Sequence, residues 1–388
     1  MFHCKPLTVL LAALLGGVCS VLPVFAGPNV AAWGAGTIYN PGDDFDYGQS
    51  IVPPNVTNAT EAAGGGEHSM ALTSDGTLQG WGYDSEGQTD FPNTNTYLAV
   101  ACGYYHSLAL LTNGTVIAEG DDTYGQSVVP AGLTNVAAIA CGFYHSLALR
   151  ADGTLAAWGA TNFALVQYGQ AQVPNGLSNV VAIAGGAYDS LVLKSDGTIF
   201  AWGYNIDGET NIPTGLSNVV AVAMGAAHGL ALKANGTVIA WGSNLYGQTN
   251  VPPGLSHVVA IAAGGWHSLA LKQDGTVVAW GYNQSGQTNV PPGLSNVMQI
   301  AAGAYQSLAV VGSGPPLTQV APTQSGPGTN GFSVSVPTQN GRVYQLEYKN
   351  SLTDSIWQSL PLQAGTGGRL PLTDPAAASQ RFYRVLRW

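Results

Sequence analysis

The sequence predicts an all-β fold: a seven-bladed β-propeller closed by the two ends of its repeat region, plus a small C-terminal β-sandwich. Three observations support this prediction. A unit of about 40 residues recurs along most of the chain. Each unit divides into short strands joined by Asp-Gly or Asn-Gly turns, which favour hairpins because these residues adopt positive φ readily. Incomplete units stand at both ends of the repeat region, and each supplies the strands that the other lacks.

The repeat is clearest in residues 258–296 and can be followed by three markers. The glycine of an Asp-Gly-Thr or Asn-Gly-Thr turn recurs at Gly76, Gly114, Gly153, Gly197, Gly236 and Gly275. The first glycine of a G-x-x-H element recurs at Gly65, Gly103, Gly142, Gly186, Gly225, Gly264 and Gly303. A Trp-Gly pair, with Glu119 replacing one tryptophan, recurs at Trp33, Trp81, Trp158, Trp202, Trp241 and Trp280. This spacing predicts four strands per unit, which we name A to D.

The end units complement one another. Residues 29–54 hold only strands C and D, and residues 297–311 hold only strands A and B. Pairing them would complete a seventh blade and remove strand edges that otherwise invite aggregation. The sequence therefore predicts a propeller over residues 27–312, a linker rich in Gly, Pro, Ser and Thr over 313–331, and a small β-sandwich-like module over 332–388.

Residues 1–26 have the features of a signal peptide. Lys5 supplies a positive charge, residues 7–18 are apolar, and cleavage is expected after Ala26. A lipoprotein attached at Cys19 is a weaker alternative because Val18 precedes the cysteine, and a retained anchor is weaker because the apolar run is short for a membrane span. We expect a secreted, periplasmic or cell-surface protein with no integral membrane segment after cleavage.

The repeat carries three diagnostic elements: G-x-x-H-S-L-A-L at 264–271, D-G-T-V-x-A-W-G at 274–281 and x-N-x-x-G-Q at 282–287. They resemble the regulator-of-chromosome-condensation repeat, and the resemblance covers residues 29–311. It implies a propeller fold. The compact unit with a G-Q-T-x-V-P segment is more similar to the bacterial propellers that inhibit β-lactamases. That similarity implies a protein partner contacted by aromatic loop residues.

Strand order places the A–B and C–D loops on one face of the propeller, which we call the variable face, and the B–C and D–A loops on the other. The B–C turns and D–A loops are monotonous, whereas the variable face concentrates aromatic and acidic residues, as binding loops on a rigid scaffold do. The predicted partner-binding residues of its A–B loops are Tyr105, Tyr144, Tyr188, Trp266 and Tyr305. Those of its C–D loops are Phe45, Tyr47, Tyr83, Asp84, Asp122, Tyr124, Tyr204, Asp207, Tyr246 and Tyr282. Glu67 and Ala227 interrupt the aromatic pattern.

Charge narrows the class of partner. The formal net charge is −10, and the propeller's four basic residues, Arg150, Lys194, Lys233 and Lys272, all end strand B beside the monotonous turns. An acidic, aromatic variable face disfavours nucleic acid and favours a protein partner, with charge favouring a basic one. Carbohydrate is the alternative ligand, since Tyr and Trp also stack on sugars. A monomer is expected.

Several polar groups resemble chemical sites but are better explained as structure. One slot holds His68, His106, His145, His228 and His267, with Asp189 and Gln306 in the remaining units. A polar side chain that recurs from blade to blade is better explained as a hydrogen-bond partner of nearby backbone groups than as a metal ligand. Glu119 and Glu209 lack a partnered base or nucleophile, and Asp43, Asp44 and Asp46 match no calcium loop. We therefore predict no catalytic residue, metal or cofactor; a polysaccharide-active enzyme is the least favoured alternative.

Two further features are left open by the sequence. Cys102 and Cys141 end strand A in neighbouring units, where free thiols are favoured over a disulfide. The tail carries basic residues, including Arg381, Arg384 and Arg387, that contrast with the acidic propeller. Docking, attachment to the cell surface and a solvated edge strand all fit this contrast, with the solvated edge as the default.

Overall fold

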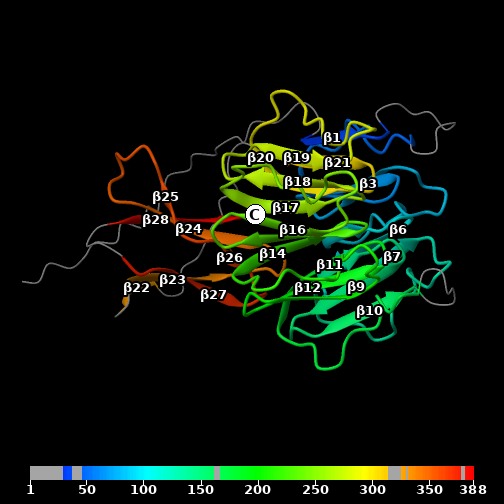
Figure 1. Ribbon diagram of the computed structural model, residues 1–388, viewed down its shortest axis with the longest axis horizontal. Helices are drawn as coiled ribbons and strands as arrows, with labels where there is room; N and C mark the ends of the chain where they lie inside the picture. The colour runs from blue at the N-terminus through cyan, green and yellow to red at the C-terminus, as the bar shows by residue number, and fades with distance from the viewer. Residues whose placement is uncertain (1–28, 37–45, 161–166, 313–324, 329–330, 377–380) are drawn as a thin grey trace, which may run out of the picture.

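The structure is a computed structural model that describes residues 29–36, 46–160, 167–312, 325–328, 331–376 and 381–388. The expected signal peptide, Phe45 and the acidic pair Asp43 and Asp44 lie outside the described residues. The described part is built from strands, turns and loops (Figure 1). It contains no helix long and apolar enough to cross a membrane.

Seven three-stranded sheets form the blades of the propeller, each with an inner, a middle and an outer strand. The inner strands are β2 (Ala59–Gly64), β5 (Tyr97–Cys102), β8 (Val136–Cys141), β11 (Val180–Gly185), β14 (Val219–Met224), β17 (Val258–Ala263) and β20 (Val297–Ala302). The middle strands are β3 (His68–Thr73), β6 (His106–Leu111), β9 (His145–Arg150), β12 (Asp189–Lys194), β15 (His228–Lys233), β18 (His267–Lys272) and β21 (Gln306–Val311). The outer strands are β4 (Leu78–Gly82), β7 (Val116–Gly120), β10 (Leu155–Gly159), β13 (Ile199–Gly203), β16 (Val238–Gly242), β19 (Val277–Gly281) and β1 (Val30–Gly34). We number the blades 1 to 7 from β2 to β20.

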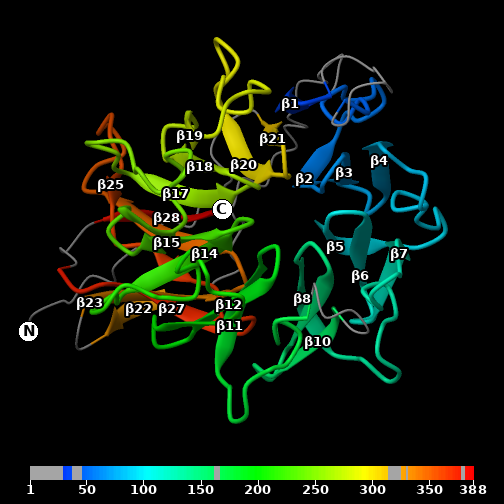
Figure 2. The same cartoon turned by 45° about the vertical axis from the view of Figure 1, so that its right-hand side comes forward.

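The ring closes as the end units predict. Strand β1 pairs antiparallel with β21, from Val30 opposite Val310 to Gly34 opposite Gln306. Each inner strand packs against the next, and β20 of blade 7 contacts β2 of blade 1 (Figure 2). The side chain of Asn29 fastens this junction, since its Nδ2 donates to the Ala59 carbonyl at 2.9 Å and its Oδ1 accepts from the Ala59 amide at 2.8 Å.

The predicted fourth strand is wrong. In the described residues the D segment of each unit runs as turns and loop, without ladder pairing. Its backbone groups bond locally instead: in blade 5 the Asn250 amide donates to Gly247 O at 3.0 Å and the Leu255 amide to Pro252 O at 3.1 Å. The prolines of this segment have no N–H, so they cannot donate the hydrogen bonds that would pair the segment with a neighbouring strand.

Residue pattern explains the remaining strands. Every middle strand is buried for five consecutive residues, and Leu147, Leu191 and Leu230 are 0% exposed. The turn to the outer strand follows from its Asp-Gly pair. In blade 6, Gly275 has a φ of 79° and Asp274 Oδ1 accepts the Thr276 amide at 3.0 Å. The monotonous turns are therefore structural, as predicted.

The C-terminal module consists of two sheets. One contains β22 (Ser325–Gly328), β23 (Gly331–Pro337) and β27 (Arg369–Asp374). The other contains β24 (Val343–Lys349), β25 (Gln358–Ser359), β26 (Gln363–Ala364) and β28 (Phe382–Arg387). Strand β22 falls within the segment expected to be a linker. Val334, Val336, Tyr344 and Leu346 are among the buried residues between the sheets.

This module docks on the propeller face formed by the B–C turns (Figure 1). The Leu362 amide donates to Ala234 O at 2.9 Å and the Gly341 amide to Val181 O at 3.1 Å. Leu386 and Trp388 join the buried cluster of blades 5 to 7. Arg342 pairs with Glu61 of blade 1 at 3.2 Å. The tail is therefore a docked cap rather than a solvated edge, and it leaves the variable face as the uncovered end of the described propeller.

Candidate protein-interaction face

Aromatic side chains on the variable face form two continuous arcs. The first arc crosses blades 7 and 1 to 4, and its neighbouring ring centroids lie 4.6 to 6.3 Å apart. Its members, in order, are Tyr47, Tyr83, Tyr105, Tyr104, Phe143, Tyr144, Tyr188, Tyr168 and Tyr204, with Tyr124 against Tyr144 at 5.2 Å. The second arc runs over blades 5 to 7 through Tyr246, Tyr282, Trp266 and Tyr305, with neighbouring centroids 4.8 to 6.3 Å apart.

The arcs meet at one end and are open at the other. Tyr104 and Tyr305 lie close enough for each phenol to shift the pKa of the other. Burial is the main cause that raises the pKa of both hydroxyls, and of Tyr105 and Tyr144 as well. At blade 5, Ala227 stands in the aromatic slot, and the row of rings is interrupted between Tyr204 and Tyr246.

The structure thus brings together every predicted aromatic residue that it describes. Three aromatic residues outside the predicted set, Tyr104, Phe143 and Tyr168, complete the first arc. Most rings are half-buried because they support one another, while Tyr168 and Tyr246 are 40% and 44% exposed. Such a surface presents large, ordered rings whose conformational entropy is already reduced, which suits protein recognition.

Sequence reasoning missed the most exposed apolar residues of this face. Ile206 and Leu245 are 77% and 78% exposed, in the C–D loops of blades 4 and 5. Other blades carry Ser85, Thr123 and Gln284 in the same slot, so alignment of the repeats could have revealed the difference. They share their loops with Tyr204 and Tyr246, the rings at which the two arcs end.

The predicted acidic residues are exposed and have a second, local role. Asp84 Oδ1 accepts the Thr89 amide at 2.8 Å, and Asp122 Oδ1 accepts the Ser127 amide at 3.1 Å. Asn205, Asn244 and Asn283 make the same contact in other blades. Asp207 is exposed within its loop. Aspartate makes the same loop hydrogen bond as asparagine does at this position, so it adds negative charge to the face while keeping that bond.

The histidine slot is structural. Each Nε2 contacts a serine Oγ of the next blade at 2.8 to 3.0 Å: His68 with Ser107, His106 with Ser146, His145 with Ser190, His228 with Ser268 and His267 with Ser307. Most of these serines donate their own proton to a backbone carbonyl, as Ser146 does to Gln126 O at 2.8 Å, so the histidine donates. Burial lowers the pKa of His145 to about 3, which keeps the ring neutral.

Two of the seven blade junctions have no histidine in this slot. Between blades 7 and 1, Gln306 Nε2 donates to His68 O at 2.9 Å and to Ser69 Oγ at 3.4 Å. Between blades 4 and 5, Asp189 takes the histidine slot and Gly229 takes the serine slot. Asp189 is 1% exposed, both its carboxyl oxygens lack a hydrogen-bond partner, and burial raises its pKa well above the usual value, with a further contribution from Glu209. Glu209 itself acts as the glutamines do, since its Oε2 accepts the Asp207 amide at 2.9 Å.

Glu119 occupies a slot in which tryptophan has a defined role. Six tryptophans donate Nε1–H to the carbonyl of the preceding blade's Gln or Glu, as Trp81 does to Gln49 O at 2.8 Å. Glu119 lies opposite Ser107, and burial raises its pKa. Ser107 donates to Cys102 Sγ at 3.6 Å rather than to a carbonyl. Nothing in this arrangement pairs Glu119 with a nucleophile or a base.

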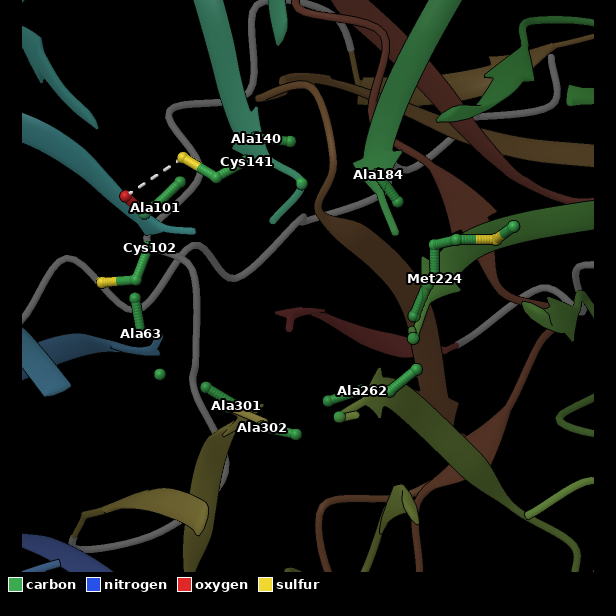
Figure 3. A pocket seen from close by; sticks show the side chains of 18 of the residues that line it. Ala63, Ala101, Cys102, Ala140, Cys141, Ala184, Met224, Ala262, Ala301 and Ala302 are labelled. Atoms are coloured by element: carbon green, nitrogen blue, oxygen red, sulfur yellow. Dashed lines mark hydrogen bonds between the residues drawn. The ribbon is translucent and has the colours of Figure 1, made fainter. Parts of the chain in front are cut away.

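The inner strands enclose a central channel of about 310 Å³ lined largely by alanine and glycine (Figure 3). Cys102 and Cys141 border it as free thiols, as expected, and Cys141 Sγ donates to Ala101 O at 3.4 Å. Burial raises the pKa of Cys102 to about 12, so this sulfur is not a ready nucleophile. Among the described residues, no group of three or more His, Cys, Asp or Glu side chains could hold a metal ion.

Comparison with known proteins agrees with this geometry. The family model "Regulator of chromosome condensation (RCC1) repeat" matches residues 60–88, 98–126, 136–170, 180–209, 219–248 and 258–287. No curated protein matches the chain in sequence.

Three solved structures illustrate the likeness. Prp20p from Saccharomyces cerevisiae is 19% identical with a TM-score of 0.59, covering 74% of this chain and 92% of that chain. Human WBSCR16 is 20% identical with a TM-score of 0.54, covering 66% and 88%. The CRINKLY WD40 ectodomain of the Arabidopsis thaliana receptor kinase ACR4 is 20% identical with a TM-score of 0.53, covering 65% and 93%. At these identities the likeness shows the fold alone.

Proposed function

Because the chain belongs to the regulator of chromosome condensation (RCC1) repeat family, we propose that it is a non-catalytic propeller that binds a protein through its variable face. The observation that carries the proposal is the pair of aromatic arcs on the uncovered end of the propeller. Exposed apolar and aromatic surface of this extent marks interaction sites on soluble proteins. The exposed Ile206 and Leu245 extend the same surface.

Two further points support a protein rather than another ligand. Yeast Prp20p has binding properties toward Gsp1p and histones, so a propeller of this fold can bind proteins. The two arcs form a broad ring of partly buried side chains rather than one deep pocket for a small molecule. The acidic loops and the absence of Lys and Arg from the variable-face loops in the sequence favour a basic partner surface.

We place this activity outside the cytoplasm, because residues 1–26 have the features of a signal peptide. Inhibition or scaffolding of an exported enzyme is the specific form that the compact repeat suggests. Expression of the full chain followed by N-terminal sequencing of the exported protein tests the location. The expected mature N-terminus is Gly27.

Capture from periplasm or culture medium tests the binding. The full chain is compared with the double variant Tyr144→Ala and Trp266→Ala, which removes one ring from each arc. Arg150→Ala, at the opposite face, is the matched control. We expect the double variant to lose the captured protein by at least about tenfold while the control retains it. Equal capture by all three proteins would refute the assignment of the face, and specific signals on a glycan array would favour carbohydrate instead.

A further inference from the structure

The hairpin loop between β24 and β25 carries the most exposed large apolar side chains of the C-terminal module. Leu352 and Ile356 are 66% and 67% exposed, whereas the other large apolar residues of the described module are buried or half-buried. The loop projects from the module on the side away from the propeller blades (Figure 1, orange). The two aliphatic side chains therefore extend into solvent far from the variable face.

Polar groups give this loop its shape. The Asp354 carboxylate accepts the amides of Asn350 at 3.1 Å and Ser351 at 3.0 Å, and Lys349 Nζ donates to the Asp354 carbonyl. None of these bonds uses the aliphatic pair. Two aliphatic side chains held outward by an ordered loop form the kind of exposed apolar patch that marks an interaction site.

Trp357 ends the loop between two cations. Its ring centroid lies 5.1 Å from Lys349 Nζ and 4.5 Å from the guanidinium carbon of Arg384. Arg381 lies 3.9 Å over the ring of Tyr348, the residue before Lys349. Basic groups and aromatic rings thus form the base from which the aliphatic pair extends.

The acids that pair with these arginines are more deeply buried than the arginines. Arg384 pairs with Glu347 at 2.6 Å, and the side chain of Arg384 is 28% exposed whereas that of Glu347 is 2% exposed. Arg381 is likewise more exposed than its partner Asp374. Residues 332–388 carry six Lys and Arg against three Asp and Glu, in contrast to the acidic propeller. The module therefore presents positive charge beside the loop, which attracts an anionic surface.

Extended aliphatic side chains, a tryptophan and surrounding cations are the parts of an interfacial membrane anchor. In such anchors the apolar groups enter the boundary between headgroups and acyl chains, tryptophan lies at the headgroup level, and Lys and Arg attract anionic lipids. A protein partner would have to match the projecting loop with an acid-rimmed apolar recess, whereas an anionic bilayer offers both chemistries at any point on its surface. The observations therefore favour a bilayer over a protein.

We propose that the β24–β25 loop docks the protein on a bilayer that contains anionic phospholipid, with Leu352 and Ile356 entering the headgroup region and the cations beside Trp357 facing the phosphates. This inference goes beyond the proposed function and does not depend on the partner of the variable face. Because the module covers the opposite face of the propeller, docking through this loop directs the variable face away from the bilayer (Figure 1). A protein bound in this way keeps its aromatic arcs free for a partner.

Co-sedimentation with lipid vesicles tests the docking. The protein starts at Gly27, the expected mature N-terminus, so that the apolar residues 7–18 are absent. One set of vesicles contains phosphatidylcholine alone, and the other contains equal parts of phosphatidylcholine and phosphatidylglycerol. We expect half-maximal binding to the anionic vesicles at about 0.1 mM lipid and roughly tenfold weaker binding to the neutral ones. Binding to the anionic vesicles should fall as added salt screens the headgroup charge.

A pair of serine substitutions in the loop tests the contribution of the aliphatic side chains. Leu352→Ser combined with Ile356→Ser should weaken binding to the anionic vesicles by roughly tenfold or more, because the aliphatic groups that leave water on docking are removed. Ile51→Ser combined with Val128→Ser is the matched control, since both residues are exposed on the propeller, and this variant should bind vesicles as the parent does. Unchanged melting temperatures establish that both variants are folded.

Two results would overturn the docking: equal binding to neutral and anionic vesicles, or unchanged binding in the Leu352→Ser and Ile356→Ser variant. Self-association that these substitutions abolish, without vesicle binding by the parent, would assign the loop to a second copy of the chain instead.

Capture of a partner separates this inference from the proposed function. The loop variant should retain a partner that the Tyr144→Ala and Trp266→Ala variant loses. Loss of capture in the loop variant would place the loop in the partner's site and refute bilayer docking. A protein that binds anionic vesicles but captures no partner would leave the docking standing and refute the binding face.

Discussion

Acidification should unfold the propeller well above the pH at which most proteins lose their carboxylate charges. Five histidines are fully enclosed between blades, and burial lowers the pKa of His68, His106, His145 and His267 to about 3 and that of His228 to about 4. In the unfolded chain the same residues titrate near 6.5. Below that pH the histidines of the unfolded chain bind protons, whereas the buried histidines of the folded chain stay neutral. The free energy of unfolding therefore falls as the pH falls.

The magnitude follows from these values. Each histidine should lower the free energy of unfolding by about 2 kcal/mol at pH 5 relative to pH 8, because a pH unit corresponds to about 1.4 kcal/mol once the unfolded ring is protonated. Five histidines together give about 10 kcal/mol, which is within the total stability of about 5–15 kcal/mol typical of folded domains. We therefore expect the folded propeller to be lost between roughly pH 6 and pH 4.5.

Urea denaturation at a series of pH values measures this effect. The pH dependence of the unfolding free energy should approach five protons taken up near pH 5. His145→Gln is the matched variant, because Gln306 already serves the same slot, where its Nε2 donates to His68 O at 2.9 Å. The variant should take up one proton fewer. Stability that is unchanged between pH 7 and pH 5, or a variant with the same proton uptake as the parent, would refute the reasoning.

Three further changes probe exceptions to the repeat. Asp189→Asn should stabilise the protein at pH 7, and this stabilisation should shrink as the pH falls toward about 4. The raised pKa of Asp189 destabilises the folded state only at a pH where the carboxyl of the unfolded chain is ionised. Urea midpoints at pH 4 and pH 7 measure the stabilisation, and the exposed Asp207→Asn should show no such trend. Glu119→Trp should raise the unfolding free energy by about 1 kcal/mol by supplying the indole donor that other blades have, and an unchanged or lower melting temperature would contradict this. Arg342→Met should lower the unfolding free energy by about 2 kcal/mol, less than for a fully buried pair because the Arg342 side chain is 29% exposed. Protease sensitivity of the module measures the last change, and Glu61→Gln combined with it should recover part of the loss.

The sequence could predict whatever depends on a repeated local pattern. Turn chemistry at Gly275 and Asp274, the buried middle strands and the complementary end units all follow from residues near one another in the chain. The predicted outer strand D fails for a reason that is also local: turn hydrogen bonds and proline leave no donors for a ladder. Strand order alone placed the aromatic loops on one face.

What the sequence could not predict depends on contacts between distant segments. The two arcs require ring positions from opposite ends of the repeat sequence, since Tyr47 and Tyr305 both belong to blade 7, and no periodicity states which rings touch. Docking of the module likewise depends on contacts between distant segments, such as the Arg342–Glu61 ion pair and the packing of Trp388 on the propeller. The basic residues of the tail and the acidic propeller suggested that the two attract one another, but net charge alone does not specify where the contact forms.

The exceptions to the repeat are not scattered evenly around the ring. Asp189, Glu209, Ala227 and Gly229 all lie at the junction of blades 4 and 5, and Ile206 and Leu245 border it on the variable face. This junction lacks the histidine–serine contact found at five others, yet strands β12 and β14 still pack across it. The repeat therefore supplies the scaffold, while the departures from it give each sector of the face its own chemistry: the buried Glu67 at blade 1, and the exposed Ile206 and Leu245 at blades 4 and 5.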